Sequence, residues 1–72
     1  MDKVLLECDF CGINLLVQDE YYVDGVTKPH GYWANMCIGC HTRFGRGLGL
    51  GRGQKYKVTC LDSKLVSVKV GG

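Results

Sequence analysis

Cys8-Asp9-Phe10-Cys11 and Cys37-Ile38-Gly39-Cys40 are the two stretches that decide the fold of this chain. Each contains two cysteines separated by two residues, and the 25 residues from 12 to 36 lie between the pairs. A gap of two residues lets one tight turn present both sulfurs of a pair to the same ion, and two pairs supply the four thiolates of a tetrahedral site. The spacing predicts one Zn²⁺ bound by Cys8, Cys11, Cys37 and Cys40.

The length and the composition agree with a domain that a metal holds together. A chain of 72 residues forms one domain and buries about 60% of the surface that its unfolded form exposes, so its core alone leaves it marginal. Small domains of this kind need a disulfide, a metal or a partner chain. We find no signal peptide and no membrane-spanning stretch. A cytoplasmic protein without membrane association is therefore expected, in which paired cysteines bind metal.

The segment between the two pairs carries strand and turn signals. Gly12 follows Cys11 directly and suits the tight turn of a zinc knuckle, where a residue with positive φ is often needed. Tyr21-Tyr22-Val23 is β-prone, and Asp24-Gly25 after it is a strong hairpin-turn signal. Trp33 is the one tryptophan of the chain, and we expect it in the core, covering the metal site.

The second half divides into a helix, a glycine-rich loop and a hairpin. Residues 37–44 predict a short helix, which Gly45 ends and which the metal nucleates through Cys37 and Cys40. Residues 45–53 have glycine at every second position and predict a loop. Residues 54–70 alternate between apolar and polar and predict a β-hairpin in which Cys60 is a buried thiol. The single domain, residues 1–72, thus comprises a zinc module (8–45), a loop (45–53) and a hairpin (54–70).

This order of parts resembles the treble-clef zinc fingers, a group that includes the GATA-type fingers. The resemblance covers residues 8–45: the knuckle at Cys8, Cys11 and Gly12, the hairpin signal, and the helix entry from Trp33 to His41. It implies a small zinc-stabilised α+β fold, to which the C-terminal hairpin is added. Residues 31–37 and the glycine-rich tract also resemble small zinc-binding proteins of bacteriophages and bacteria. An all-β zinc ribbon, with hairpins at both pairs, is the alternative fold.

Other chemistries fit the cysteines less completely. Cys37 to His41 match the C-x-x-C-H pattern of c-type haem attachment, which leaves Cys8 and Cys11 unexplained. Iron in a rubredoxin-like site is the closer rival of zinc, because ligand type alone separates the two metals poorly. A dithiol redox role lacks the βαβ context typical of such motifs. Four thiolates leave no open position on the metal, so the protein is predicted to be non-enzymatic, with no small-molecule substrate.

The charge distribution is asymmetric. Residues 1–27 contain six acidic residues and one lysine, a net charge of −5, whereas residues 28–72 contain eight basic residues and one aspartate, a net charge of +7. The basic half suggests an anionic partner. Nucleic-acid binding with little sequence specificity is the first hypothesis, because glycines let the backbone approach phosphates that basic side chains neutralise. Its candidate residues are Arg43, Arg46, Arg52, Lys55 and Lys57.

A protein partner is the second hypothesis. Leu48 and Leu50 of the glycine-rich loop could enter a groove on that partner. If the phage resemblance holds, the chain is expected in the cytoplasm of a bacterial host, where it would inhibit a host enzyme or a defence protein. In the third interpretation Leu48 and Leu50 pack against the core, and the basic residues are simply solvated.

Overall fold

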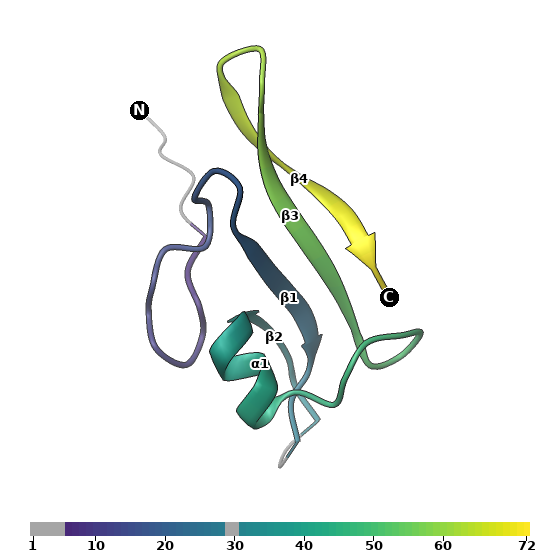
Figure 1. Cartoon of the computed structure of the whole chain (residues 1–72). Helices are drawn as coiled ribbons and strands as arrows, with labels where there is room; N and C mark the ends of the chain where they lie inside the picture. The colour runs from purple at the N-terminus through teal and green to yellow at the C-terminus, as the bar shows by residue number, and fades with distance from the viewer. Residues whose placement is uncertain (1–5, 29–30) are drawn as a thin grey trace.

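The computed structural model describes residues 6–28 and 31–72, and these form a four-stranded antiparallel sheet with one short helix (Figure 1). The strands lie in the order β2-β1-β3-β4 across the sheet. The helix starts directly after β2, at the second cysteine pair, which does not fit the all-β alternative. The elements in chain order are β1 (Tyr21–Val26), β2 (Trp33–Cys37), α1 (Ile38–Phe44), β3 (Gly53–Leu61) and β4 (Lys64–Gly71).

β1 is one of the two inner strands, and it contains the dipeptide that we expected to form a turn. Asp24 and Gly25 lie within β1, paired with Asn35 and Ala34 of β2, so the prediction of a hairpin turn there is wrong. Gly25 is needed for a different reason: a Cβ at this position would lie 2.8 Å from the carbonyl oxygen of Arg52. The glycine permits the close approach of two backbones rather than a tight turn.

The core lies between the sheet, the helix and the knuckle segment. Val23, Met36 and Val58 are its largest fully buried side chains, and each comes from a different strand. Met36 and Val58 belong to one buried cluster that includes two of the cysteines, and its other members are Cys8, Leu15, Tyr22, Ala34 and Cys40. Two of the four candidate metal ligands, Cys8 and Cys40, are therefore part of the hydrophobic core.

Trp33 does not belong to this core. Its side chain is 53% exposed at the start of β2, so the prediction that it covers the metal site is wrong. Tyr22 and Tyr56 take the structural role instead: they are partners on β1 and β3, and their rings stack with centroids 5.3 Å apart. A stacked pair of tyrosines thus packs at the core in place of the single tryptophan.

The C-terminal hairpin forms as predicted, with one difference. Asp62 and Ser63 both have positive φ, at 52° and 65°, and connect Leu61 to Lys64 in a two-residue turn that matches the right-handed twist of the strands. Cys60 is exposed rather than buried, because this end of β3 extends past β1 (Figure 1). The extension gives the described chain an elongated form, 37 × 23 × 18 Å.

Candidate metal centre

The first cysteine pair lies in a tight turn before β1. The N–H of Gly12 donates to the carbonyl of Cys8 at 2.9 Å, and the N–H of Cys8 donates to the carbonyl of Ile13 at 2.9 Å. Gly12 has a φ of +78°, a conformation that favours glycine. The turn therefore folds back on itself over six residues, and it brings Cys8 and Cys11 to the same side.

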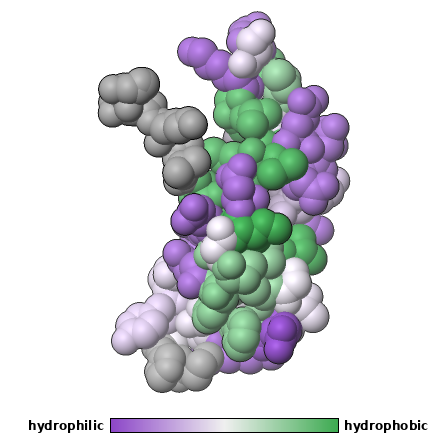
Figure 2. Space-filling model, turned by 90° about the vertical axis from the view of Figure 1, so that its left-hand side faces the viewer, coloured by the Kyte–Doolittle hydropathy of each residue, from purple (hydrophilic) through white to green (hydrophobic). Residues whose placement is uncertain are grey.

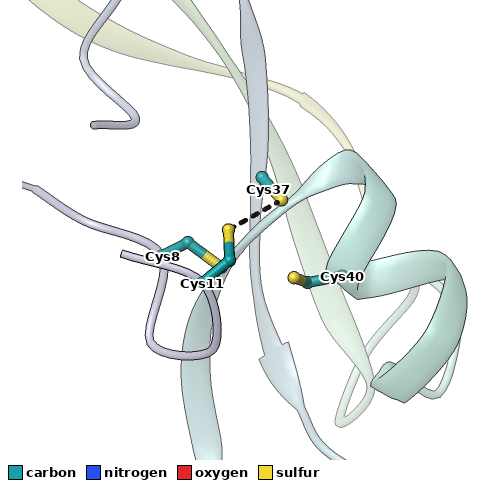
Figure 3. A group of neighbouring side chains, drawn as sticks. All are labelled: Cys8, Cys11, Cys37 and Cys40. Atoms are coloured by element: carbon teal, nitrogen blue, oxygen red, sulfur yellow. Dashed lines mark hydrogen bonds between the residues drawn. The ribbon is translucent and has the colours of Figure 1, made fainter. Parts of the chain in front are cut away.

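The second pair lies where β2 passes into α1. Cys37 is the last residue of β2 and the N-cap of α1, with extended backbone (φ −68°, ψ 165°), and Cys40 lies in the first turn of the helix. The change from strand to helix between them turns both side chains toward the knuckle (Figure 3). A helix of seven residues is too short to be stable alone, so its position depends on β2 and on contacts with the knuckle.

The four sulfurs come together at one point (Figure 3). All four Sγ atoms lie within 4.8 Å of one another, and those of Cys11 and Cys37 are 3.8 Å apart. A tetrahedral site with metal–sulfur bonds of about 2.3 Å has its sulfurs about 3.8 Å apart, whereas a disulfide bond measures about 2.05 Å. All four cysteines are free thiols. The cluster thus has the ligand type, number and spacing of a four-thiolate metal site.

Two thiols of the cluster, Cys8 and Cys40, have pKa values that are shifted in opposite directions. Burial raises the pKa of Cys8, but the backbone N–H groups of Cys37, Cys11 and Phe10 outweigh it and lower the pKa to about 6. Burial, followed by the neighbouring thiols, raises the pKa of Cys40 to about 12. A bound cation resolves this conflict, since it favours the thiolate form of every sulfur around it.

Contacts between the knuckle and the second pair hold the centre together. The rings of Phe10 and Phe44 stack with centroids 4.5 Å apart and planes inclined by 17°, which joins the knuckle to the end of α1. Asp9 is hydrogen-bonded to Asn35 of β2 in both directions. Two sets of protein contacts, the stacked rings and the hydrogen bonds between Asp9 and Asn35, therefore hold the two cysteine pairs together.

Apolar side chains also gather on the outer surface beside the centre. Figure 2 shows a band of hydrophobic residues on the side of the molecule that carries the knuckle segment and α1. Ile13 and Val17, which follow the first cysteine pair in the chain, are 55% and 43% exposed. With Tyr21 and Cys37 they line a cavity of about 210 Å³, which is smaller than the roughly 300–1,000 Å³ typical of small-molecule sites.

Two side chains attach the glycine-rich loop to the rest of the domain, one from α1 and one from the start of the loop. The Nε2 atom of His41 lies 3.1 Å from the carbonyl oxygen of Gly47, so this histidine contacts the loop. The guanidinium of Arg46 donates to the carbonyls of Thr27 and Lys28, from Nε at 3.2 Å and from Nη2 at 2.7 Å. Arg46 therefore has a structural role that its sequence context did not indicate.

The other candidate basic residues are dispersed over the surface. The guanidinium of Arg43 lies 5.6 Å from the ring centroid of Phe44, and Arg52 is exposed in the loop. Lys55 and Lys57 of β3 both reach over the ring of Tyr21, with Nζ atoms 4.8 and 5.9 Å from its centroid. Tyr21 was missed as a candidate, because its neighbourhood depends on the pairing of β1 with β3.

The two leucines of the loop differ in their exposure. Leu50 is 96% exposed at the loop tip, whereas Leu48 is 38% exposed. A Cβ at Gly71 of β4 would lie 3.5 Å from Leu48 Cδ1, so Leu48 rests near the end of β4. The interpretation in which both leucines pack against the core fails for Leu50.

No protein-family model, curated protein or solved structure matches this chain. Within residues 6–28 and 31–72, no helix combines the length and the apolar character that crossing a membrane requires. What the molecule itself establishes is a small α+β domain whose four clustered cysteines could hold a metal ion, as in zinc-finger-like modules.

Proposed function

We propose that the four cysteines bind one Zn²⁺ and that the domain is a treble-clef-like zinc finger. The converging sulfurs at tetrahedral spacing carry this proposal. The order of parts supports it too, because the hairpin of β1 and β2 lies between the knuckle and the cysteines at the start of α1. Four thiolates complete the coordination of the ion, so the role of the metal is to stabilise the fold and not to catalyse.

Metal content and optical spectra test the first part of this proposal. One equivalent of zinc per chain is expected in the purified protein, and replacement by Co²⁺ is expected to give the intense visible bands of a tetrahedral thiolate complex. A coloured, iron-containing protein from a medium that supplies both metals contradicts zinc. A Soret band identifies haem instead.

The domain is further proposed to bind nucleic acid with little sequence preference. The supporting observation is the arrangement of Tyr21, Lys55 and Lys57 on one face of the β1–β3 pair, with both amines over the aromatic ring. An exposed ring can stack on a base, and the lysines beside it can neutralise phosphates. Arg43 and Arg52 are further basic candidates elsewhere on the surface, while Arg46 serves mainly to hold the loop.

A titration of the isotope-labelled, zinc-loaded protein with a short single-stranded DNA and with a duplex tests this activity. Shifts are expected at Tyr21, Lys55 and Lys57, and they should weaken as salt rises. Lys55→Ala with Lys57→Ala should lower the affinity and flatten its salt dependence. Lys69→Ala is the matched control, because Lys69 pairs with Tyr56 and therefore points to the opposite face of the sheet. A silent titration at low salt contradicts nucleic-acid binding.

A protein-interaction module is the second candidate, and the exposure of Leu50 favours it. A leucine that is 96% exposed on a glycine-flanked tip is available to a groove on a partner. In this form the chain would be a phage-encoded inhibitor of a host enzyme or defence protein. A partner captured from bacterial lysate by the wild type should be lost with Leu50→Asp. Retention of that partner by the variant contradicts a role of the leucine.

A further inference from the structure

β4 lies at one edge of the sheet, and its outer side is uncovered within the described ranges 6–28 and 31–72 (Figure 1). The opposite edge, β2, is different: its Asn35 exchanges backbone and side-chain hydrogen bonds with Asp9 of the knuckle. β4 runs for eight residues, and its Leu65, Val68 and Val70 are 43%, 47% and 51% exposed. A long apolar edge strand is a template for pairing with another strand.

The hydrogen bonds of β3 determine which groups of β4 point outward. Val58 donates its N–H to the carbonyl of Glu20 at 2.9 Å and accepts from the N–H of Asp19 at 2.8 Å. The N–H and C=O of Val58 thus point away from β4, the strand in which Ser67 is its pairing partner. The pair of Val58 and Ser67 is of the non-hydrogen-bonded type, so the N–H and C=O of Ser67 point away from β3. By alternation, the same holds for Leu65 and Lys69.

We propose that β4 pairs with β4 of a second copy of this chain, antiparallel about a two-fold axis at Ser67. In this register Ser67 faces Ser67, and Leu65 of each copy faces Lys69 of the other. Every one of these is an outward-pointing residue, so all three N–H groups and all three C=O groups on each strand find partners. The two sheets become one continuous eight-stranded sheet.

The side chains favour the same register. Val66 of each copy lies opposite Val68 of the other, and Lys64 lies opposite Val70, so no lysine faces a lysine across the axis. Like charges directly opposite one another destabilise a strand pair. A register with its axis at Lys69 would place two lysines together and would pair only the five residues from Ser67 to Gly71. Pairing at Ser67 overlaps the strand from Lys64 to Val70.

Opposite charge changes at one position test the pairing and its register together. Leu65→Glu places a carboxylate opposite Lys69 of the second copy, twice per dimer, whereas Leu65→Lys places an amine there. The dissociation constant of the dimer, measured by sedimentation in reducing buffer, should fall with Leu65→Glu and rise with Leu65→Lys. The two symmetric pairs together should change it by about 2- to 30-fold in each direction.

Leu61→Glu and Leu61→Lys are the matched controls, because Leu61 is 60% exposed on β3 and lies away from the proposed axis. They reproduce the change of net charge, and they should shift the constant less than the variants at Leu65. Equal shifts at both positions overturn the register. A wild-type protein that stays monomeric at millimolar concentration overturns the proposed pairing itself.

A direct measurement identifies the contacting strand in the wild type. In a mixture of labelled and unlabelled chains, an intermolecular NOE is expected between the Hα atoms of Val66 and Val68, which face each other in a non-hydrogen-bonded pair at close range. Intermolecular NOEs that map to the glycine-rich loop or to the knuckle, with none on β4, overturn the proposal. This measurement needs no substitution and therefore does not depend on the folding of a variant.

Discussion

Asp9 and Asn35 exchange two hydrogen bonds next to the cysteine cluster. The backbone N–H of Asp9 donates to the carbonyl of Asn35 at 2.8 Å, and the backbone N–H of Asn35 donates to Asp9 Oδ2 at 2.8 Å. Asp9 lies inside the first cysteine pair, and Asn35 lies two residues before the second. This exchange fixes the knuckle on the edge of β2, so protein contacts align the two halves of the candidate metal centre.

Asp9→Ala should weaken metal binding and lower the free energy of unfolding. The substitution removes the carboxylate that accepts from Asn35, and we expect a loss of about 1 kcal/mol for a hydrogen bond at this exposed position. Thermal unfolding of the zinc-loaded protein and competition with a chelator measure the two effects. Glu20→Ala, which removes an exposed acid from the same half of the chain, should change neither quantity comparably. Equal effects of both variants would show that charge, and not the hydrogen bond, matters.

Cys37→Ser should unfold the domain, whereas Cys60→Ser should leave it folded. Cys37 belongs to the cluster and also joins β2 to α1, while Cys60 is exposed outside the cluster. In small metal domains the binding free energy of the ion is largely the folding free energy. Chelation of the wild type should therefore have the same effect as Cys37→Ser. Amide dispersion in NMR spectra reports both, and native dispersion in Cys37→Ser contradicts a structural metal.

Metal affinity should fall as pH is lowered, because binding requires thiolates and releases protons. The pKa of Cys40 is raised to about 12 and that of Cys11 is raised as well, so at neutral pH both are thiols that must lose a proton. Cys8, with a pKa lowered to about 6, is already mostly ionised there. Calorimetry of zinc binding in buffers of different ionisation enthalpy should detect at least the protons of Cys11 and Cys40. An affinity independent of pH between about 6 and 8 would contradict this.

The local signals of the sequence predicted the parts of the fold that depend on neighbouring residues. The grouping of the cysteines, the helix after Cys37 and the hairpin of residues 54–70 all follow from short-range chemistry, and the structure contains each of them. The four sulfurs could be grouped without a structure because one tetrahedral ion imposes the same requirement on both pairs.

The failures involve contacts between segments that are distant in the chain. Gly25 is a glycine because the backbone at the start of β3 approaches it closely. The dipeptide Asp24-Gly25 therefore has the composition of a hairpin turn but forms none. Cys60 has the alternation of core residues, but it lies beyond the end of β1. Trp33 is expected in the core as the one large aromatic, but it lies out of phase with the buried Ala34 and Met36 at the start of an edge strand. Whether an apolar face is covered depends on which element reaches it, and periodicity alone does not contain that information.

Arg46→Ala should destabilise the domain, while Arg52→Ala should not. The guanidinium of Arg46 bonds to the carbonyls of Thr27 and Lys28 and joins the glycine-rich loop to the β1–β2 connection. We expect a cost of about 1 kcal/mol, which in a domain of this size lowers the melting temperature by about 4–8 °C. Both variants lose one positive charge, so Arg52→Ala is the matched control. Equal melting temperatures would show that the bonds of Arg46 contribute nothing to stability.

Tyr21→Ala should weaken nucleic-acid binding without changing its salt dependence, if Tyr21 stacks on a base. Base–aromatic stacking contributes about 1–3 kcal/mol, so the affinity for single-stranded DNA should fall by about 5- to 150-fold. Tyr21→Phe keeps the ring and should bind nearly as well as the wild type. The lysine variants at positions 55 and 57 differ from both, because they remove phosphate contacts and flatten the dependence on salt.

The two kinds of variant thus separate base stacking by Tyr21 from phosphate neutralisation by Lys55 and Lys57. The ring of Tyr21 also lines the cavity beside Cys37, so the melting temperature of Tyr21→Ala must be measured with its affinity. A stable variant that binds as tightly as the wild type would remove the sheet face from the binding surface. The exposed tip at Leu50 would then be the better candidate for a contact with a protein partner.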